Sequence, residues 1–75
     1  MYVERIRYIV RRTRDSAIMC GLAHDFKFKK EGEIGDTAIK TYLSEKKAYA
    51  AAKSAFGYED NEVYVERIHE TLSTY

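Results

Sequence analysis

The two residues best suited to chemistry are Cys20 and His24, which lie four positions apart. A thiolate beside an imidazole can bind a metal ion or act as a nucleophile. A structural zinc site needs four ligands at recognisable spacing, and the sequence has no second cysteine and no His-x-x-x-His pair. We therefore predict that Cys20 is a buried structural thiol, with no metal and no cofactor. A single cysteine also excludes an internal disulfide and favours a reducing compartment.

A cluster of carboxylates is the second candidate for chemistry. Glu31, Glu33 and Asp36 lack the alternating ligand spacing of a calcium loop, and the Gly32–Gly35 spelling G-x-x-G carries an acidic insert where nucleic-acid clamps are basic. The sequence also contains no phosphate-cradling glycine loop, catalytic-triad spelling or nucleophile elbow. The expectation is that the protein is not an enzyme and that these carboxylates are solvated loop charges.

Basic side chains alternate along residues 2–12, which have the period-two pattern of a strand. The pentapeptide YVERI at residues 2–6 recurs at residues 64–68, and the two copies are expected to occupy equivalent places in one sheet. The basic side chains then predicted to converge on the face that the helix leaves open are Arg5, Arg7, Arg11, Arg67 and His69. Such a face is either a solvated outer surface or a binding surface for something acidic.

Tyrosine is the other unusual residue type, with seven copies in 75 residues. It combines a large contact area with a polar tip, so these side chains either form an interface or shield a small core. Tyr64 stands in the second YVERI copy and completes the set of candidate binding residues.

These side chains must be positioned by a sheet and a helix, and the helix has the clearer boundaries. Ser44 is the predicted N-cap, and Gly57 is suited to the left-handed position that ends a helix. Between them, alanines recur at three- and four-residue spacing, whereas the lysines fall on the opposite side. The pattern predicts a helix over residues 45–56 that packs its alanine face flat on a sheet.

The preceding residues, 37–43, are rich in β-branched and aromatic side chains and break the helical phase, which favours a strand. The alternative is one helix capped by Asp36 that runs to Phe56.

The other predicted strands are residues 2–12, 17–23 and 63–72. Residues 24–30 either extend the second of these strands or form a separate one. Gly21 is expected at a bulge or a close backbone approach. The fold class is therefore α+β: a small antiparallel or mixed sheet in a single layer, with one helix packed on one face, in the order β-β-β-α-β.

Length and charge set the remaining limits. Residues 1–75 are long enough for a single domain with a thin core. The 13 basic and 12 acidic residues nearly cancel, so a generally basic nucleic-acid protein is not indicated, although a local patch is compatible with this balance. No signal-peptide pattern or membrane-length apolar run is present, and we expect a cytoplasmic protein without membrane contact.

Residues 40–48, KTYLSEKKA, followed by Ala51 and Ala52, are similar to the end of the arm-site DNA-binding domain of tyrosine-family integrases. In that family a three-stranded sheet lies in the major groove with the helix behind it. The resemblance implies that Arg5, Arg7 and Arg11 face DNA, although this chain continues into a further strand.

The whole layout also resembles small orphan proteins of bacteriophages and prophages, through its opening YVER strand, its Tyr-Leu-Ser helix start and its closing VYVE strand. This resemblance implies a non-enzymatic protein that binds a host protein and inhibits it, for example a component of CRISPR defence. A homodimer is a further expectation, since unpaired strand edges can be completed by another chain. The alternative function is a DNA- or RNA-binding module that uses the basic face.

Overall fold

An antiparallel sheet in the order β3-β2-β1-β4 organises the chain, with one α-helix and one 3-10 helix beside it. The computed structural model describes the backbone of residues 2–73 and the side chains of residues 5–69. Within this part the elements are β1 (Tyr2–Arg12), β2 (Ile18–Cys20), β3 (Lys27–Lys29), η1 (Glu31–Glu33), α1 (Glu45–Phe56) and β4 (Val63–Ser73). The predicted α+β class and the order β-β-β-α-β are confirmed.

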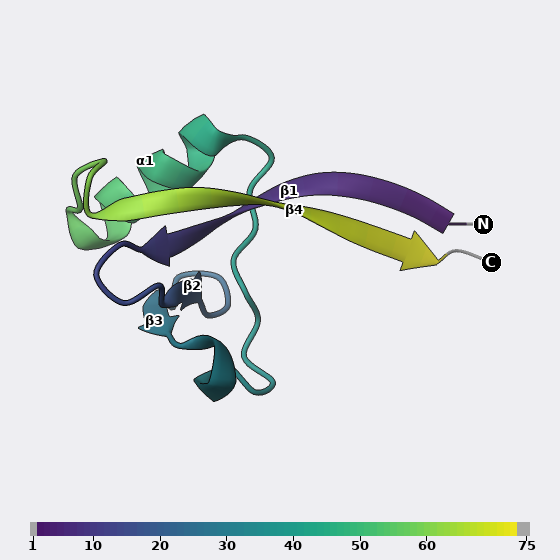
Figure 1. Ribbon diagram of the computed structural model, residues 1–75, viewed down its shortest axis with the longest axis horizontal. Helices are drawn as coiled ribbons and strands as arrows, with labels where there is room; N and C mark the ends of the chain where they lie inside the picture. The colour runs from purple at the N-terminus through teal and green to yellow at the C-terminus, as the bar shows by residue number, and fades with distance from the viewer. Residues whose placement is uncertain (1, 74–75) are drawn as a thin grey trace.

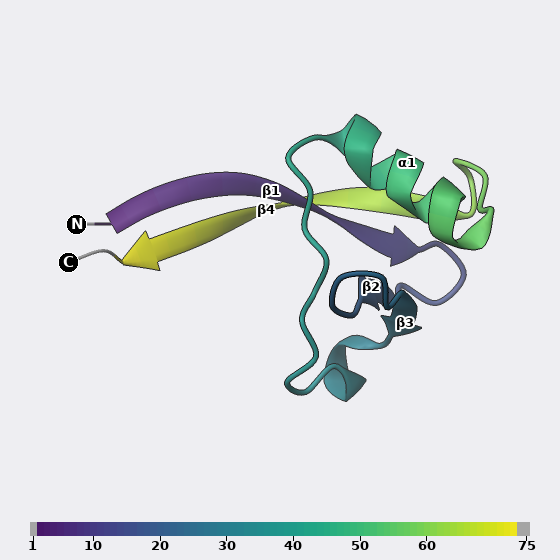
Figure 2. The same cartoon turned by 180° about the vertical axis from the view of Figure 1, so that it is seen from behind.

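β1 and β4 form the longest ladder of the sheet. They pair from Tyr2 opposite Ser73 to Arg12 opposite Val63. One half of this ribbon lies against the rest of the molecule, and the other half, which includes the start of β1 and the end of β4, projects beyond it (Figures 1 and 2). The side chains of Tyr2, Val3 and Glu4, which belong to the first YVERI copy, lie outside the described residues.

The strand predicted at residues 17–23 is shorter than expected and ends at Cys20. β1 and β2 pair at Arg11, opposite Ile18, and the two strands then diverge. Residues 24–30 do form a separate strand, β3, which pairs with β2 from Ile18 opposite Lys29 to Cys20 opposite Lys27. The third strand of the order is therefore β3.

Residues 37–43 are not a strand of the ladder, and the prediction of one is wrong. They form an extended strap that fills the space between the diverging strands. The strap bridges β2 at Ile39, opposite Cys20, and β1 at Tyr42, opposite Tyr8. Tyr8 and Tyr42 exchange two backbone hydrogen bonds of 2.9 Å. The strap pairs with β2 and with β1 through one isolated bridge each. Its β-branched and aromatic residues therefore adopt an extended backbone without forming a ladder. The alternative of one helix from Asp36 to Phe56 is excluded.

The helix has the predicted boundaries. The Ser44 hydroxyl accepts a hydrogen bond from the Lys47 amide at 3.2 Å, which satisfies one free donor of the first turn. Gly57 adopts the left-handed conformation, with φ of 71°, and its amide donates to the Lys53 carbonyl. Both ends are thus set by local signals.

One face of the sheet carries the main core. Ala48 and Ala52 of α1 are fully buried against Val10, Met19 and Val63. Since alanine adds little bulk, the helix backbone lies close to the sheet, as predicted. Aromatic rings fill the margin of this core beside β3 and the end of α1: Phe26, Phe28, Phe56 and Tyr58.

The other face was expected to be bare, and this prediction is wrong. Ile9 and Ile18 point to that side, where Ile34, the residue after η1, packs on them. η1 and α1 lie on opposite sides of the β1–β4 ribbon (Figures 1 and 2). The sheet is therefore partly covered on both faces, by a helix on one and by a short turn and the strap on the other.

The chain leaves β2 through a glycine that no other residue can replace without strain. Gly21 has φ of 118°, and a β-carbon built there would lie 2.1 Å from the Asp25 carbonyl oxygen. Both the positive φ and the close approach require glycine. The prediction of a close backbone approach at Gly21 is confirmed.

A charged pair stabilises the turn between β1 and β2. The Arg12 guanidinium donates to both Asp15 carboxylate oxygens, at 3.0 and 2.7 Å, and lies 5.0 Å above the centre of the Phe28 ring. The hydrogen bonds from Arg12, with a further one from the Ala17 amide, lower the pKa of Asp15 to about 2. The same pairing raises the pKa of Arg12.

Replacing Gly21 by alanine should lower the free energy of unfolding by more than about 2 kcal/mol, because the added β-carbon meets backbone and the positive φ is strained. The matched control is Gly32→Ala, since a β-carbon at Gly32 meets nothing within 4 Å. Urea unfolding followed by circular dichroism measures both. Equal stability of the two variants would show that the chain relaxes easily after Cys20.

The Asp15→Asn variant should be less stable than the parent chain at pH 7, and the difference should vanish in acid. A carboxylate whose pKa is lower in the folded chain than in the unfolded chain stabilises the fold above the unfolded value, near 3.9. That contribution is lost as the pH falls toward about 2, the folded value. Thermal unfolding from pH 7 to pH 2 measures this, with exposed Asp60→Asn as the control. A stability difference at pH 2 that is as large as the one at pH 7 would contradict the assignment.

Candidate functional site

A groove of about 630 Å³ opens on the face of the sheet opposite α1. Its floor is made of isoleucines, and its rim carries charged and hydroxyl side chains. Ile9, Ile18 and Ile34 are buried in the second, smaller core, whereas Ile68 is half-buried and Ile39 is exposed. The lining residues are Ile9, Arg11, Ile18, Glu31, Ile34, Gly35, Thr37, Ile39, Thr41, Glu66 and Ile68.

The groove follows from strand alternation on three neighbouring elements. Ile9 lies on β1 opposite Glu66 of β4, and side chains of opposed residues in an antiparallel pair share one face. Ile68, two residues further along β4, lies on the same face for the same reason. The strap contributes Ile39, which is 40% exposed. An apolar floor is thus left partly open between β4 and the strap.

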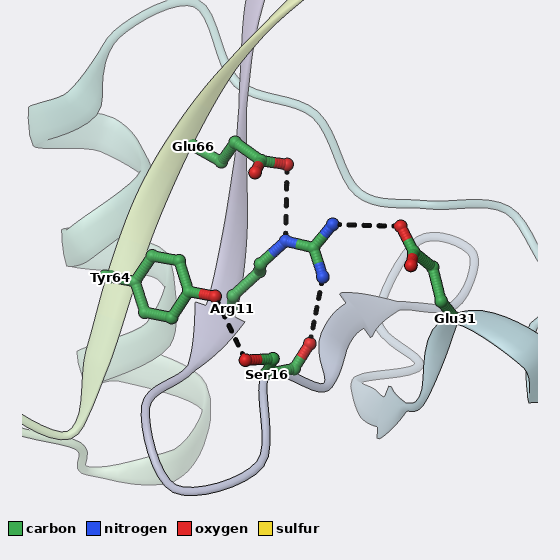
Figure 3. A network of polar contacts seen from close by, with 5 residues as sticks. All are labelled: Arg11, Ser16, Glu31, Tyr64 and Glu66. Atoms are coloured by element: carbon green, nitrogen blue, oxygen red, sulfur yellow. Dashed lines mark hydrogen bonds and ion pairs between the residues drawn. The ribbon is translucent and has the colours of Figure 1, made fainter.

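Arg11 is the central polar residue of the groove. Its side chain is 13% exposed, and its Nε donates to Glu66 Oε1 at 3.2 Å. One terminal nitrogen donates to Glu31 Oε1 at 3.1 Å, and the other donates to the Ser16 carbonyl at 3.0 Å. These contacts join β1, β4, η1 and the β1–β2 turn around one guanidinium (Figure 3).

The electrostatics of Arg11 reflect two opposing effects. Burial disfavours its charged form, but the hydrogen bonds with Glu31 and Glu66 outweigh burial and raise the pKa of Arg11. The guanidinium is therefore a fixed positive charge, and each of its three nitrogens already donates one hydrogen bond. Close by, the Tyr64 hydroxyl donates to the Ser16 hydroxyl at 3.2 Å, which places Tyr64 at the edge of this network.

The predicted set of basic binding residues is split between the two faces. Arg5, Arg7 and Arg11 do alternate on one face of β1, as expected. Arg67 lies opposite Tyr8, and His69 lies opposite Ile6, so both share the face on which Tyr8 packs with the α1 core. The predicted convergence of all five is wrong. Tyr64, opposite Arg11, does share the groove side.

The register of β1 and β4 explains why the basic residues are split between the two faces. Each even-numbered residue of β1 lies opposite an odd-numbered residue of β4. The described residues of the first YVERI copy therefore point to the opposite face from their counterparts in the second copy: Ile68 borders the groove, whereas Ile6 points to the α1 side and is 44% exposed. The repeated pentapeptide marks two strands of one sheet without giving them equivalent faces.

The Cys20–His24 pair does not form a site. Cys20 is fully buried, as predicted, and His24 is exposed in the loop before β3. Among residues with described side chains, no three His, Cys, Asp or Glu groups are placed to share a metal ion.

Arg11 is the one lining residue that belongs to the predicted set of binding residues. Glu31, Ile34 and Ile39 are among those that sequence reasoning missed. Ile34 carried a usable signal, because it is the single apolar side chain between Phe28 and Ala38. Such a residue in a polar stretch frequently anchors a loop on a core. No sequence signal marked Glu31, because its contact with Arg11 spans 20 positions.

Within residues 2–73, no helix has both the length and the apolar composition needed to cross a membrane. Comparison of the chain with known protein families, with curated proteins and with solved structures finds no match.

Proposed function

We propose that this chain is a non-enzymatic protein-binding module that receives a segment of its partner in the groove opposite α1. The observation that carries the proposal is the partly open isoleucine floor, where Ile39 of the strap is exposed and Ile68 of β4 is half-buried above the buried Ile9. Apolar surface rimmed by polar side chains is typical of interaction sites. The groove volume of about 630 Å³ also lies within the range of functional pockets.

Strand geometry favours a polypeptide as the occupant. The groove is bounded by β4 on one side and by the extended strap on the other, so an extended segment can lie along it and direct alternate side chains to the floor. The outer edge of β4 offers a second route to protein binding, namely self-association through strand pairing.

We also propose that the partner is a bacterial host protein that is inhibited when its surface is occupied, with a component of CRISPR defence as one candidate. This finer proposal is supported by the resemblance to phage orphan proteins and by the small size of the chain. Inhibition by occupation needs a complementary surface and no reactive group.

Binding through the groove can be tested with a library of short random peptides selected against the purified chain. The Ile39→Asp variant, which adds charge to the floor, and Thr41→Phe, which fills the groove, should each weaken the selected peptides at least about tenfold. Ala50→Asp adds the same charge on the exposed side of α1 and should leave affinity unchanged. Isothermal calorimetry measures the affinities. Selected peptides that bind all three variants equally would place the site elsewhere.

A DNA- or RNA-binding function is the second candidate, and the observation that favours it is the shared face of Arg5 and Arg7 on the projecting ribbon. Arg11 contributes less than expected to such a surface, because its charge is matched by two carboxylates.

If this candidate is correct, the Arg5→Ala, Arg7→Ala double variant should bind a short duplex or single strand with a salt slope lower by about one for each arginine, since fewer counterions are released. The control Lys46→Ala, Lys53→Ala changes two exposed charges on α1 and should keep the slope. Gel-shift titrations over a range of salt concentrations provide the measurement. No shift at low salt would remove this function.

A further inference from the structure

The accessible charge of the groove is negative. The residues that line it include one arginine and two glutamates. The Arg11 side chain is 13% exposed, whereas those of Glu31 and Glu66 are 75% and 44% exposed. A partner that enters from solvent therefore meets carboxylates before it meets the guanidinium.

Both carboxylates keep binding capacity while they hold Arg11. Each contacts the guanidinium through Oε1. Within residues 5–69, where side chains are described, the contacts of Glu31 and Glu66 leave Oε2 of each without a donor. A carboxylate can accept several hydrogen bonds, so an incoming ammonium or guanidinium can be bound without breaking the existing network.

The floor beside these carboxylates suits the stem of a long basic side chain. Half-buried Ile68 lies next to Glu66 on the groove face, and Ile39 of the strap, which is 40% exposed, completes the accessible part of the floor. Lysine and arginine lay their methylene groups along apolar surface while the charged end stays in a polar place. A shorter acidic side chain would leave this floor uncovered and would bring a negative charge toward two others.

We propose that the groove selects an extended segment of a partner protein in which lysine or arginine alternates with a small aliphatic residue, so that both side chains point to the same face of the segment. This inference rests on the proposed protein-binding function and adds the chemistry of the partner. The basic end pairs with Glu31 and Glu66, and the aliphatic side chain, two residues away, packs on the isoleucines.

The test compares three synthetic peptides that differ only in the side chains at their second and sixth positions, which are basic, neutral or acidic: acetyl-TKTVTRT-amide, acetyl-TQTVTQT-amide and acetyl-TETVTET-amide. With the parent chain at low salt, the basic peptide should bind at least about threefold tighter than the glutamine peptide, and the glutamate peptide should bind weakest. Fluorescence anisotropy of labelled peptides gives the affinities. Shifts of the isoleucine methyl signals in nuclear magnetic resonance spectra show whether the peptide occupies the groove.

Charge variants of the 3-10 helix show whether the peptide preference comes from the groove or from the overall charge of the protein. Glu31→Lys should reverse the preference toward the glutamate peptide, and Glu31→Gln, which disturbs folding less, should reduce the preference for the basic one. Glu33→Lys makes the same charge change on the same turn, at an exposed position outside the groove, and should preserve the order. Circular dichroism confirms that each variant is folded.

Several outcomes would overturn the inference. Equal binding of the three peptides, tighter binding of the glutamate peptide by the parent chain, or an equal effect of Glu33→Lys and Glu31→Lys would each do so. If library peptides still require the groove while the basic peptide does not bind, the partner chemistry is wrong and the protein-binding proposal stands. If no peptide requires the groove, both fail.

Discussion

β1 and β4 pair along their whole length, from Tyr2 opposite Ser73 to Arg12 opposite Val63. This register assigns every described side chain of the two strands to one of two faces, because opposed residues of an antiparallel pair share a face. It brings Val10 and Val63 toward α1 and Ile9 and Ile68 toward the groove. A shift by one residue would exchange the two sets, so this one ladder decides both where the main core forms and where the binding surface lies.

The divergence of β1 from β2 gives the fold its second layer. After the pair Arg11–Ile18, the space between the strands is filled by the strap, which bridges β2 at Ile39 and β1 at Tyr42. Since the strap alternates like a strand, Tyr42 points to the helix side while Ile39 lines the groove. Burial on that side also raises the pKa of Tyr42. An irregular connection thereby contributes to both faces of the sheet.

Local signals were enough to predict the helix, because Ser44 and Gly57 set its ends through contacts that span a few residues. The alternation in residues 2–12 likewise predicted β1, and the face shared by Arg5, Arg7 and Arg11 followed from it. The position of Arg67 could not be predicted in the same way. It depends on a register between strands separated by most of the chain, and the repeated pentapeptide indicated the wrong parity. The groove depends further on Ile34 and Glu31, whose partners are set by the path of the strap and not by local preference.

A thin core explains why the groove remains open. A chain of this length buries a limited fraction of its surface, and α1 uses the available apolar side chains on one face of the sheet. The opposite face receives Ile34 and one charge network, which bury Ile9 and Ile18 but leave Ile68 half-buried and Ile39 of the strap 40% exposed. Arg11 compensates in part, because its contacts with Glu31 and Glu66 hold η1 against the sheet without adding apolar cover. A bound segment would complete this second layer, so binding and stability should be coupled: any partner that fills the groove also stabilises the fold.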